Sequence, residues 1–316
     1  MMEKPLYVIG IDGGGTKSTA VLCALDGNIL AEAQGGPTNF HITGIEPASH
    51  TILDLIASCC HTIGCTISQI GAVVAGLAGA GRSTDQQQML DGLMSVAQKR
   101  SLPLNSVVVE SDARIAVEGA FSGKPGIIVI AGTGSIVFAK DERGKTFRSG
   151  GWGRLIGDEG SGYAIGQSAF RAVARAIDNR TKRTRLATLF EEKHGLGTQQ
   201  AIINALYKEQ FDIASTAPLV MEAASKGDPA AKKILSEACT DLTGVIRAVL
   251  CGMNKGLRRP PRRPLAFVGR LLEKENMYSR MLRTSIRRER LPVTVHSAES
   301  SPVVGAALMA IEITKS

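Results

Sequence analysis

The chain has 316 residues, of which 44% are hydrophobic, 21% charged and 4% aromatic, and its formal net charge is +8 at pH 7. This composition excludes disordered and fibrous proteins, and the length favours two domains over a single core. The basic residues gather in three runs, at 180–185, 258–263 and 283–290. Because aromatic residues are scarce, we interpret these runs as solvated faces that help to attract an anionic nucleotide, and we expect no nucleic-acid binding.

The first apolar run, at residues 6–11, is far shorter than the ~20 residues that a membrane span needs. We therefore expect no signal peptide, no membrane association and a cytoplasmic location. The six cysteines form no Cys-x-x-Cys pair and have no histidine at zinc spacing. Free thiols in a reducing compartment are the expected state.

Strands and helices alternate through the first half of the chain, which is typical of a mixed α/β sheet. Two of the strands flank the turn Asp26-Gly27-Asn28, so that a hairpin opens the sheet. Strands are expected at residues 8–11, 19–24, 29–33, 72–77 and 107–110. Helices are expected at residues 47–62 and 84–99, and a third begins at Asp112.

The second half begins in the same way as the first. A strand at residues 127–131 leads into a glycine-rich turn, a second strand and a polar hairpin tip. In both halves a threonine that follows a glycine precedes the hairpin-tip glycine by eleven positions (16 to 27, and 133 to 144). The pattern predicts a duplicated lobe.

Helical patterns dominate from Gly157 to about Gly252, and a further strand is expected at residues 265–268. An apolar helix rich in alanine and glycine is expected at residues 302–313. The predicted first lobe comprises residues 1–113 and 299–316, and the predicted second lobe comprises residues 114–298. An apolar helical face could also support a homodimer.

The strongest motif begins with Asp12 at the end of a strand and continues through three glycines to Thr16 and Lys17; the glycines are Gly13, Gly14 and Gly15. Glycines allow the backbone to approach a phosphate, while backbone N–H groups and the Thr16 hydroxyl donate hydrogen bonds. Asp12 is placed to hold Mg²⁺ through water, because Mg²⁺ keeps most of its hydration shell. The alternative is a hairpin turn with an incidental aspartate.

A second turn with the same chemistry, Gly132-Thr133-Gly134-Ser135, opens the second lobe. Two such turns that faced one another across a cleft would grip a triphosphate from both sides. Residues 139–146 fit a permissive Walker pattern, but no helix follows them, so we interpret them as a hairpin.

A buried-type strand delivers Asp112 to the edge of the first sheet, where active groups of α/β proteins collect. A carboxylate there can accept the proton of an attacking hydroxyl in phosphoryl transfer. The alternative is that Asp112 only caps the helix that follows.

A dense glycine stretch at residues 150–163 contains the single tryptophan, Trp152, and the pair Asp158-Glu159. Ordering so many glycines costs entropy, which favours a segment that shapes a binding site. Its backbone amides and carboxylates could hold sugar hydroxyls. The alternative is a flexible loop before a capped helix.

Together these motifs resemble the N-acetylglucosamine kinase group of the BadF/BadG/BcrA/BcrD ATPase family, which also includes the activator ATPases of benzoyl-CoA reductase and 2-hydroxyacyl-CoA dehydratase. The resemblance covers nearly the whole chain and is most specific in Gly151-Trp152-Gly153 with residues 157–161. It implies an α/β fold of the two-lobed actin-like (ribonuclease H-like) class, with duplicated lobes around a nucleotide cleft. It also implies ATP and Mg²⁺ as cofactors.

The resemblance assigns roles to individual residues. Asp112 would be the catalytic base, and Asn39 and Asp158 would be sugar ligands. The nucleotide would be bound by the two turns, from Gly13 to Lys17 and from Gly132 to Gly134, and by Gly269 in the adenosine loop. Further sugar-side residues would be Ser135, Gly151, Trp152 and Gly153.

The implied activity is the ATP-dependent phosphorylation of N-acetyl-D-glucosamine at C6. Arg270 follows Gly269 where the family has a second glycine, and His41 stands where the animal N-acetylglucosamine kinases have tryptophan. The identity of the sugar therefore stays open, and glucosamine or another hexose is the alternative. Two further alternatives are an ATPase that acts on a partner protein and a sugar sensor without catalysis.

Overall fold

The computed structural model describes residues 6–315, and the chain divides into two compact units. The first extends to Pro125 and includes the C-terminal segment from Ala298, and the second is Gly126–Ser297. The first lobe was predicted to end at residue 113, inside the helix α4 (Asp112–Ala120), and α4 lies in the first unit because it packs against the C-terminal helix.

No helix within residues 6–315 has the length and apolar character needed to cross a membrane. The expectation about a signal peptide falls partly on residues 1–5, which lie outside the described residues.

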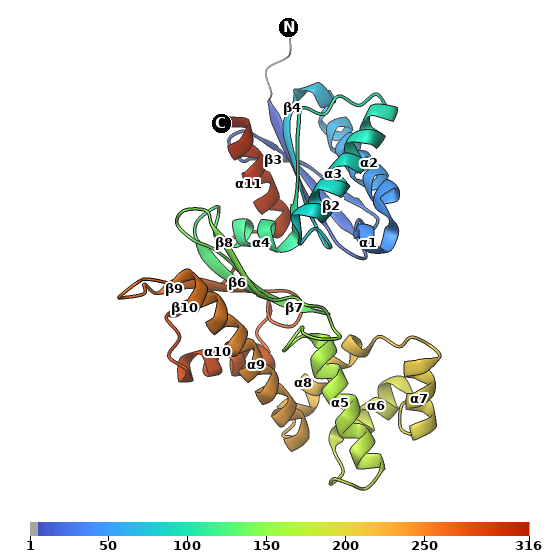
Figure 1. Cartoon of the computed structure of the whole chain (residues 1–316). Coiled ribbons are helices and arrows are strands. Elements are labelled where there is room, and N and C mark those ends of the chain that lie inside the picture. Colours follow the sequence, from blue (N-terminus) through green and yellow to red (C-terminus); the bar gives the residue numbers. More distant parts are fainter. Residues whose placement is uncertain (1–5, 316) are drawn as a thin grey trace. The chain divides into compact units, whose positions relative to one another are not determined.

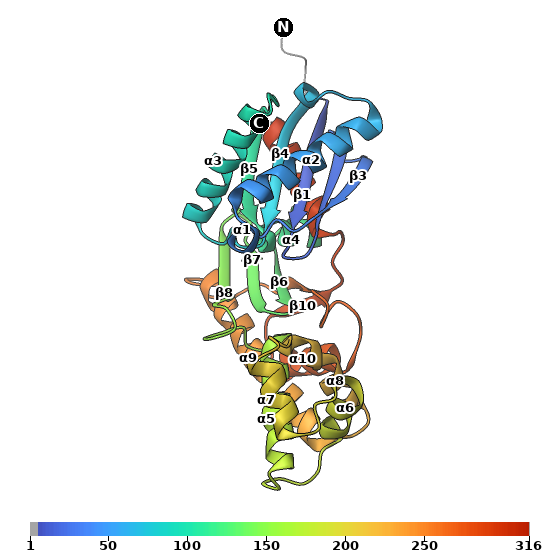
Figure 2. The same ribbon diagram turned by 90° about the vertical axis from the view of Figure 1, so that its right-hand side faces the viewer.

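Five strands form the sheet of the first unit in the order β3-β2-β1-β4-β5 (Figures 1 and 2). The strands are β1 (Tyr7–Gly13), β2 (Ser18–Ala24), β3 (Ile29–Gly35), β4 (Ile70–Leu77) and β5 (Ser106–Ser111). The first three are joined by antiparallel hairpins, whereas β1, β4 and β5 run parallel. The carboxyl ends of β1, β4 and β5 therefore meet at one edge of the sheet, where functional groups collect.

Helices cover both faces of this sheet, two on each side (Figure 1). On one side lie α2 (Ile45–Ile63) and α3 (Ser83–Lys99), and on the other lie α4 and α11 (Pro302–Lys315). Successive side chains of β1 alternate between the two cores, with Ile9 and Ile11 in the first and Val8 in the second. Short helices are α1 (Phe40–Thr43) and the 3₁₀ turn Ile67–Gln69.

Three glycines allow α11 to lie directly against β1 and α4. A Cβ on Gly10 would collide with the backbone of α11, and a Cβ on Gly305 would collide with the backbone of α4 at Ile115. A Cβ on Gly119 would strike the carbonyl of Ser301. The C-terminal helix, predicted to be small enough to pack closely, is thus held by backbone contact that only glycine permits.

The second unit repeats the strand order of the first, β10-β9-β6-β7-β8. The strands are β6 (Gly126–Ala131), β7 (Ser135–Lys140), β8 (Thr146–Gly150), β9 (Arg263–Val268) and β10 (Val293–His296). Again three strands form antiparallel hairpins and two add in parallel. The predicted duplication is confirmed, and residues 139–146 lie in the β7–β8 hairpin as expected.

The rest of the second unit is helical, as predicted, and shares one hydrophobic core with the sheet. The helices are α5 (Gly162–Ile177), α6 (Arg185–His194), α7 (Gln199–Tyr207), α8 (Ala217–Ser225), α9 (Pro229–Met253) and α10 (Met277–Arg288), with a 3₁₀ turn at Ile213–Thr216. The strands β8 and β10 were not predicted. Both are short edge strands in which, apart from Val293, the side chains are exposed or half-buried, so they lack the apolar run that marks a buried strand.

Candidate active site

The first glycine-threonine turn joins β1 to β2 and is fixed by its neighbours at the sheet edge. The carbonyl of Gly14 accepts hydrogen bonds from the N–H groups of Thr38 (3.0 Å) and Asn39 (3.2 Å), and the carbonyl of Gly13 accepts one from Ala78 (2.8 Å). The turn is thereby tied to the segments that follow β3 and β4. The tip, from Gly15 to Lys17, remains exposed and can meet a ligand.

Gly13 has a packing reason to be glycine as well as a binding one. A Cβ at this position would collide with the side chains of Thr38 and Leu77. The hydroxyl of Thr38 also forms a buried hydrogen bond of 2.8 Å with the hydroxyl of Ser18 at the start of β2. The sequence motif did not reveal Thr38 as the residue that supports the turn.

Asp12 lies near the end of β1, half-buried beside this turn. The pKa of its carboxyl is raised to about 6. Burial is the largest cause, the nearby carboxylate of Asp112 adds to the shift, and Lys17 opposes it. The two aspartates that the motifs singled out are therefore close enough to interact. A pair of crowded carboxylates is a site that a cation stabilises.

Asp112 is the first residue of α4, directly after β5. The N-cap of α4 is Ser111, whose hydroxyl accepts from the N–H of Arg114 at 3.1 Å, so capping does not explain Asp112. The Asp112 carboxylate is accessible and accepts from the N–H of Ala113 at 2.8 Å. Desolvation by the surrounding protein raises the pKa of Asp112, although hydrogen bonds from backbone N–H groups oppose this shift.

Asn39 and His41 lie beside the first turn. The Oδ1 atom of Asn39 caps α1 and accepts from the N–H of His41 at 3.2 Å. The His41 Nε2 atom lies 3.2 Å from the carbonyl oxygen of Gly79 and 4.0 Å from the Asp85 carboxylate. The loops after β3 and β4 thus hold the predicted sugar ligand next to the histidine that departs from the family pattern.

We expect Asp12→Asn to stabilise the metal-free protein at neutral pH. The folded state holds the Asp12 proton up to about pH 6, against an ordinary pKa of 3.8, so the stability that this group contributes is present at low pH. It is lost as the pH rises through 6, because the buried carboxylate must then ionise. The free energy of unfolding should rise by about 1–3 kcal/mol at pH 7.5 and change little at pH 4.

Urea unfolding of the two proteins at both pH values, without added Mg²⁺, measures this difference. Asp91→Asn, on the surface of α3, is the matched control and should be neutral at both. A loss of stability in Asp12→Asn at pH 7.5 would contradict the burial argument.

The second glycine-threonine turn, between β6 and β7, rests on the start of α5. The N–H groups of Gly162 and Tyr163 donate to the carbonyls of Gly132 (2.8 Å) and Thr133 (3.2 Å). Within the turn, the N–H of Gly132 donates to the carbonyl of Gly134 at 2.9 Å. The positive end of the α5 dipole therefore lies against a turn that was predicted to bind phosphate.

Asp158 and Ser135, both predicted on the sugar side, are buried in the second unit. The Asp158 carboxylate accepts from the N–H groups of Ser135 and Gly153; burial raises its pKa and these bonds lower it. The Ser135 hydroxyl donates to the carbonyl of Glu159 at 2.7 Å. The two side chains thus fasten the second turn to the glycine-rich segment.

The middle of the glycine-rich segment, residues 152–156, is exposed. Gly151 and Gly153 have positive φ angles of 68° and 85°, which explains the glycines, and Trp152 between them is 72% exposed. Leu155 and Ile156 are also largely exposed. An apolar, accessible rim of this kind is typical of a ligand-binding surface.

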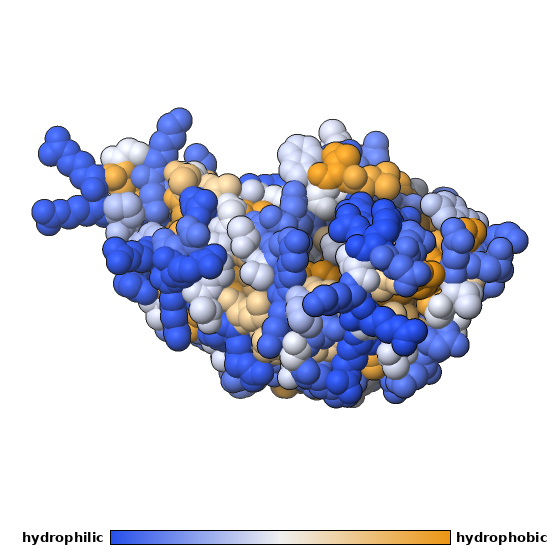
Figure 3. Space-filling model, turned by 90° about the horizontal axis from the view of Figure 1, so that it is seen from below, coloured by the Kyte–Doolittle hydropathy of each residue, from blue (hydrophilic) through white to orange (hydrophobic). Residues whose placement is uncertain are grey.

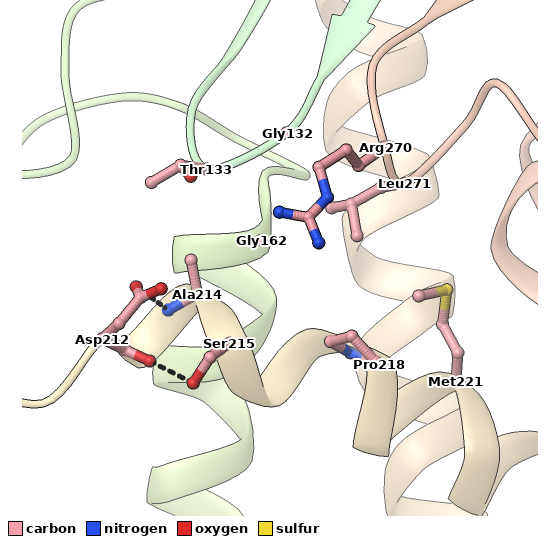
Figure 4. A pocket seen from close by; sticks show the side chains of 10 residues that line it. All are labelled: Gly132, Thr133, Gly162, Asp212, Ala214, Ser215, Pro218, Met221, Arg270 and Leu271. Carbon is pink, nitrogen blue, oxygen red and sulfur yellow. Dashed lines mark hydrogen bonds between the residues drawn. The ribbon is translucent and has the colours of Figure 1, made fainter. Parts of the chain in front are cut away.

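A pocket of about 300 Å³ adjoins the second turn. Figure 4 shows the Arg270 guanidinium extending into its centre, with Thr133 on one wall and Asp212 and Ser215 on another. Gly269, at φ 91°, passes so close to β6 that a Cβ would lie 2.6 Å from the carbonyl oxygen of Ala131. Arg270 and Leu271, directly after the predicted adenosine loop, therefore line the same pocket as Gly132 and Thr133 of the second turn.

The structure brings the predicted residues together within each unit. Asp12, the first turn, Asn39 and Asp112 lie at one edge of the first sheet. In the second unit, Gly132 and Thr133 of the second turn line the 300 Å³ pocket, and Gly269 directly precedes Arg270, which also lines it. The sequence did not indicate Asp212 and Ser215 as lining residues. Asp212 caps the 3₁₀ turn Ile213–Thr216 and Ser215 lies within it, and no local pattern marked this turn within the helical region. Among residues 6–315 no group of three metal-ligating side chains is found.

Comparisons with known proteins place this geometry in context. The model of the BadF/BadG/BcrA/BcrD ATPase family matches residues 9–310. An N-acetylmuramic acid/N-acetylglucosamine kinase of Clostridium acetobutylicum is 36% identical over 77% of this chain and 79% of its own length. An N-acetyl-D-glucosamine kinase of Dictyostelium discoideum is 29% identical over 99% of this chain and 100% of its own.

Among solved structures, that of a candidate N-acetylglucosamine kinase from Chromobacterium violaceum superposes with a TM-score of 0.74. The two sequences are 28% identical, and the superposition covers 98% of this chain and 99% of the other chain. The similarity and the two duplicated sheets confirm the predicted fold class, an α/β fold of the two-lobed actin-like type.

Proposed function

Because the chain belongs to the BadF/BadG/BcrA/BcrD ATPase family, we propose that it is an ATP-dependent sugar kinase that phosphorylates N-acetyl-D-glucosamine at C6. The observation that carries this proposal is the position of Asp112. It is accessible, it does not cap α4, and it lies beside Asp12 at the sheet edge that holds the first turn. The names of the two similar enzymes support an amino sugar as the substrate.

Each unit carries a glycine-threonine turn that can bind the phosphates of ATP, and the pocket of the second unit beside its turn can hold another part of the nucleotide. Backbone N–H groups and the hydroxyls of Thr16 and Thr133 donate to phosphate oxygens, and the start of α5 adds its dipole. Arg270 supplies a positive charge in the pocket where the family pattern has glycine, so it can pair with a phosphate or stack on the base.

Mg²⁺ fits the pair formed by Asp12 and Asp112, whose mutual repulsion a cation would relieve. Asp12 would hold the ion through water, since Mg²⁺ sites in nucleotide enzymes need only one or two carboxylates beside the phosphates. The ion would neutralise charge on the phosphate oxygens during transfer.

Asp112 accepts the proton of the attacking C6 hydroxyl. As the bond from the sugar oxygen to the γ-phosphorus forms, the bond from that phosphorus to the ADP oxygen breaks, and the proton passes to the Asp112 carboxylate. Its raised pKa makes the carboxylate a stronger base than an ordinary aspartate.

Asn39 and the backbone of Gly151 to Gly153 bind the sugar hydroxyls, and the exposed ring of Trp152 covers an apolar part of the sugar. Asp158 and Ser135 act on the same side by holding this segment against the second turn. His41, beside Asn39, contributes to the choice among amino sugars.

A coupled assay of ATP consumption over a panel of sugars tests the proposal. The panel comprises N-acetylglucosamine, N-acetylmannosamine, N-acetylmuramic acid, glucosamine and glucose, and NMR of the product locates the phosphate. We expect ATP turnover that depends on an amino sugar. Hydrolysis that no sugar stimulates would favour an ATPase that acts on a protein partner, and sugar binding without turnover would favour a sensor.

A further inference from the structure

A second pocket of the second unit has no part in the proposed kinase reaction. It lies between the C-terminal half of α5, the segment at residues 181–184 and the start of α9, and its volume is about 460 Å³. Five basic side chains line it: Arg171, Arg175, Lys182, Arg183 and Lys233. One of the three basic runs of the sequence therefore forms the wall of a cavity.

The charges in this pocket are not balanced. Its two acidic residues are Asp228 and Glu237, against five basic ones. Glu237 lies 3.8 Å from Lys233 at the surface. Within residues 6–315 the other four basic side chains form no salt bridge. Arg171 and Arg175 are four positions apart on α5 and therefore lie one turn apart on the same side of the helix. Such like-charge proximity is unfavourable until an anion relieves it.

Asp228 is occupied in building the pocket. Its Oδ2 atom accepts from the Thr184 hydroxyl (2.9 Å) and the Arg185 N–H (2.7 Å), and its Oδ1 atom accepts from the Ala231 N–H (2.8 Å). These bonds fasten the basic segment to the start of α9. The buried carboxylate thus holds the basic segment in place, and one carboxylate here with Glu237 leaves the five basic side chains in excess.

The remaining lining is partly apolar and comes from Ala172, Pro229, Ala230 and Ile234. A bare inorganic ion would leave this surface unused, whereas a carbon skeleton would cover it. The volume lies within the range of pockets that hold small organic ligands. A lining that combines basic and apolar side chains suits an organic molecule that carries a phosphate.

This pocket shares no lining residue with the nucleotide pocket. The two adjoin different parts of α5, because the second turn contacts Gly162 at the start of that helix and the basic pocket begins at Ser168. Figure 3 views the molecule from the end at which α5 finishes and α9 starts, and the surface there is mainly hydrophilic.

We propose that the pocket between α5, residues 181–184 and α9 is a second binding site, for a small organic phosphate of about the size of a hexose phosphate. The proposal rests on the excess of basic side chains and on the apolar residues in the same lining, and it goes beyond the proposed kinase function.

Titration calorimetry of the full chain with glucose 6-phosphate tests the site. A saturating non-hydrolysable ATP analogue and N-acetylglucosamine are present throughout, so that binding at a catalytic centre is blocked. The variants are Arg171→Gln with Arg175→Gln, and Lys182→Gln with Arg183→Gln. The matched control, Arg258→Gln with Arg259→Gln, removes the same charge from an exposed loop elsewhere.

We expect saturable binding to the wild type and the control, and at least tenfold weaker binding to each pocket variant, because charge-assisted contacts to phosphate are lost. Basal turnover and the thermal midpoint should be unchanged in both variants, whose altered side chains are exposed. The proposal is overturned if the wild type does not bind, if both variants bind like the control, or if inorganic phosphate binds as tightly as glucose 6-phosphate.

Discussion

Asp112→Asn is expected to lower kcat by about 10²–10⁴-fold while nucleotide affinity stays within about twofold of the wild type. Asparagine keeps the size of the side chain and can still approach a sugar hydroxyl, but it cannot take up the proton. Ser111, which caps α4, is untouched, so the helix should remain intact. Steady-state kinetics with the preferred sugar and a fluorescent ATP analogue measure the two quantities.

Asp91→Asn serves as the control for Asp112→Asn, because Asp91 is exposed on α3, where its carboxylate accepts a hydrogen bond from Gln87 of the same helix. It should leave both kcat and nucleotide affinity unchanged. Wild-type turnover in Asp112→Asn would remove Asp112 from the mechanism. Loss of nucleotide binding together with turnover would instead indicate a structural role.

Gly305→Ala is expected to lower the free energy of unfolding by about 3 kcal/mol, the upper end of the usual cost of overpacking. A methyl group at this position meets the carbonyl of Ile115 and the backbone of Gly119 in α4. Backbone atoms cannot move aside as a flexible side chain can, so α11 must shift away from α4. Thermal and urea unfolding measure the loss.

Gly244→Ala is the matched control, because Gly244 is also inside a helix, α9, but a Cβ there meets no atom within 4 Å. It should be neutral or stabilise the protein by up to about 1 kcal/mol, the helix propensity gained over glycine. Equal effects of the two substitutions would show that propensity, and not the contact between α11 and α4, decides the outcome at Gly305.

Much of the fold could be predicted from local patterns. The alternation of Val8, Ile9 and Ile11 between two cores is the pattern of a strand covered on both faces, and the paired spacings around Thr16 and Thr133 marked the duplication. The strands β8 and β10 escaped prediction because edge strands of four or five residues can be polar. Hydrogen bonding to a neighbouring strand, which the sequence does not display, defines them.

The parts of the candidate site that could be predicted are those that a short stretch of sequence marks. A glycine run after Asp12 and an aspartate at the end of β5 are local signals, and both lie at the sheet edge as expected. The partners of these residues are not local. Thr38 supports the first turn from 24 residues beyond Gly14, and Arg270 enters the pocket of Thr133 from a loop far along the chain.

The sequence by itself determined the duplicated α/β lobes, the two glycine-threonine turns and the carboxylate at the end of β5, because hydrophobic period and glycine placement act over a few residues. Only the tertiary structure decided that Ser111 and not Asp112 caps α4. It also decided that Asp158 is buried and accepts hydrogen bonds from the backbone of Ser135 and Gly153, and that a basic run lines a pocket. Each of these depends on which distant backbone groups and charges lie within a few ångströms. Chain order alone does not specify that proximity.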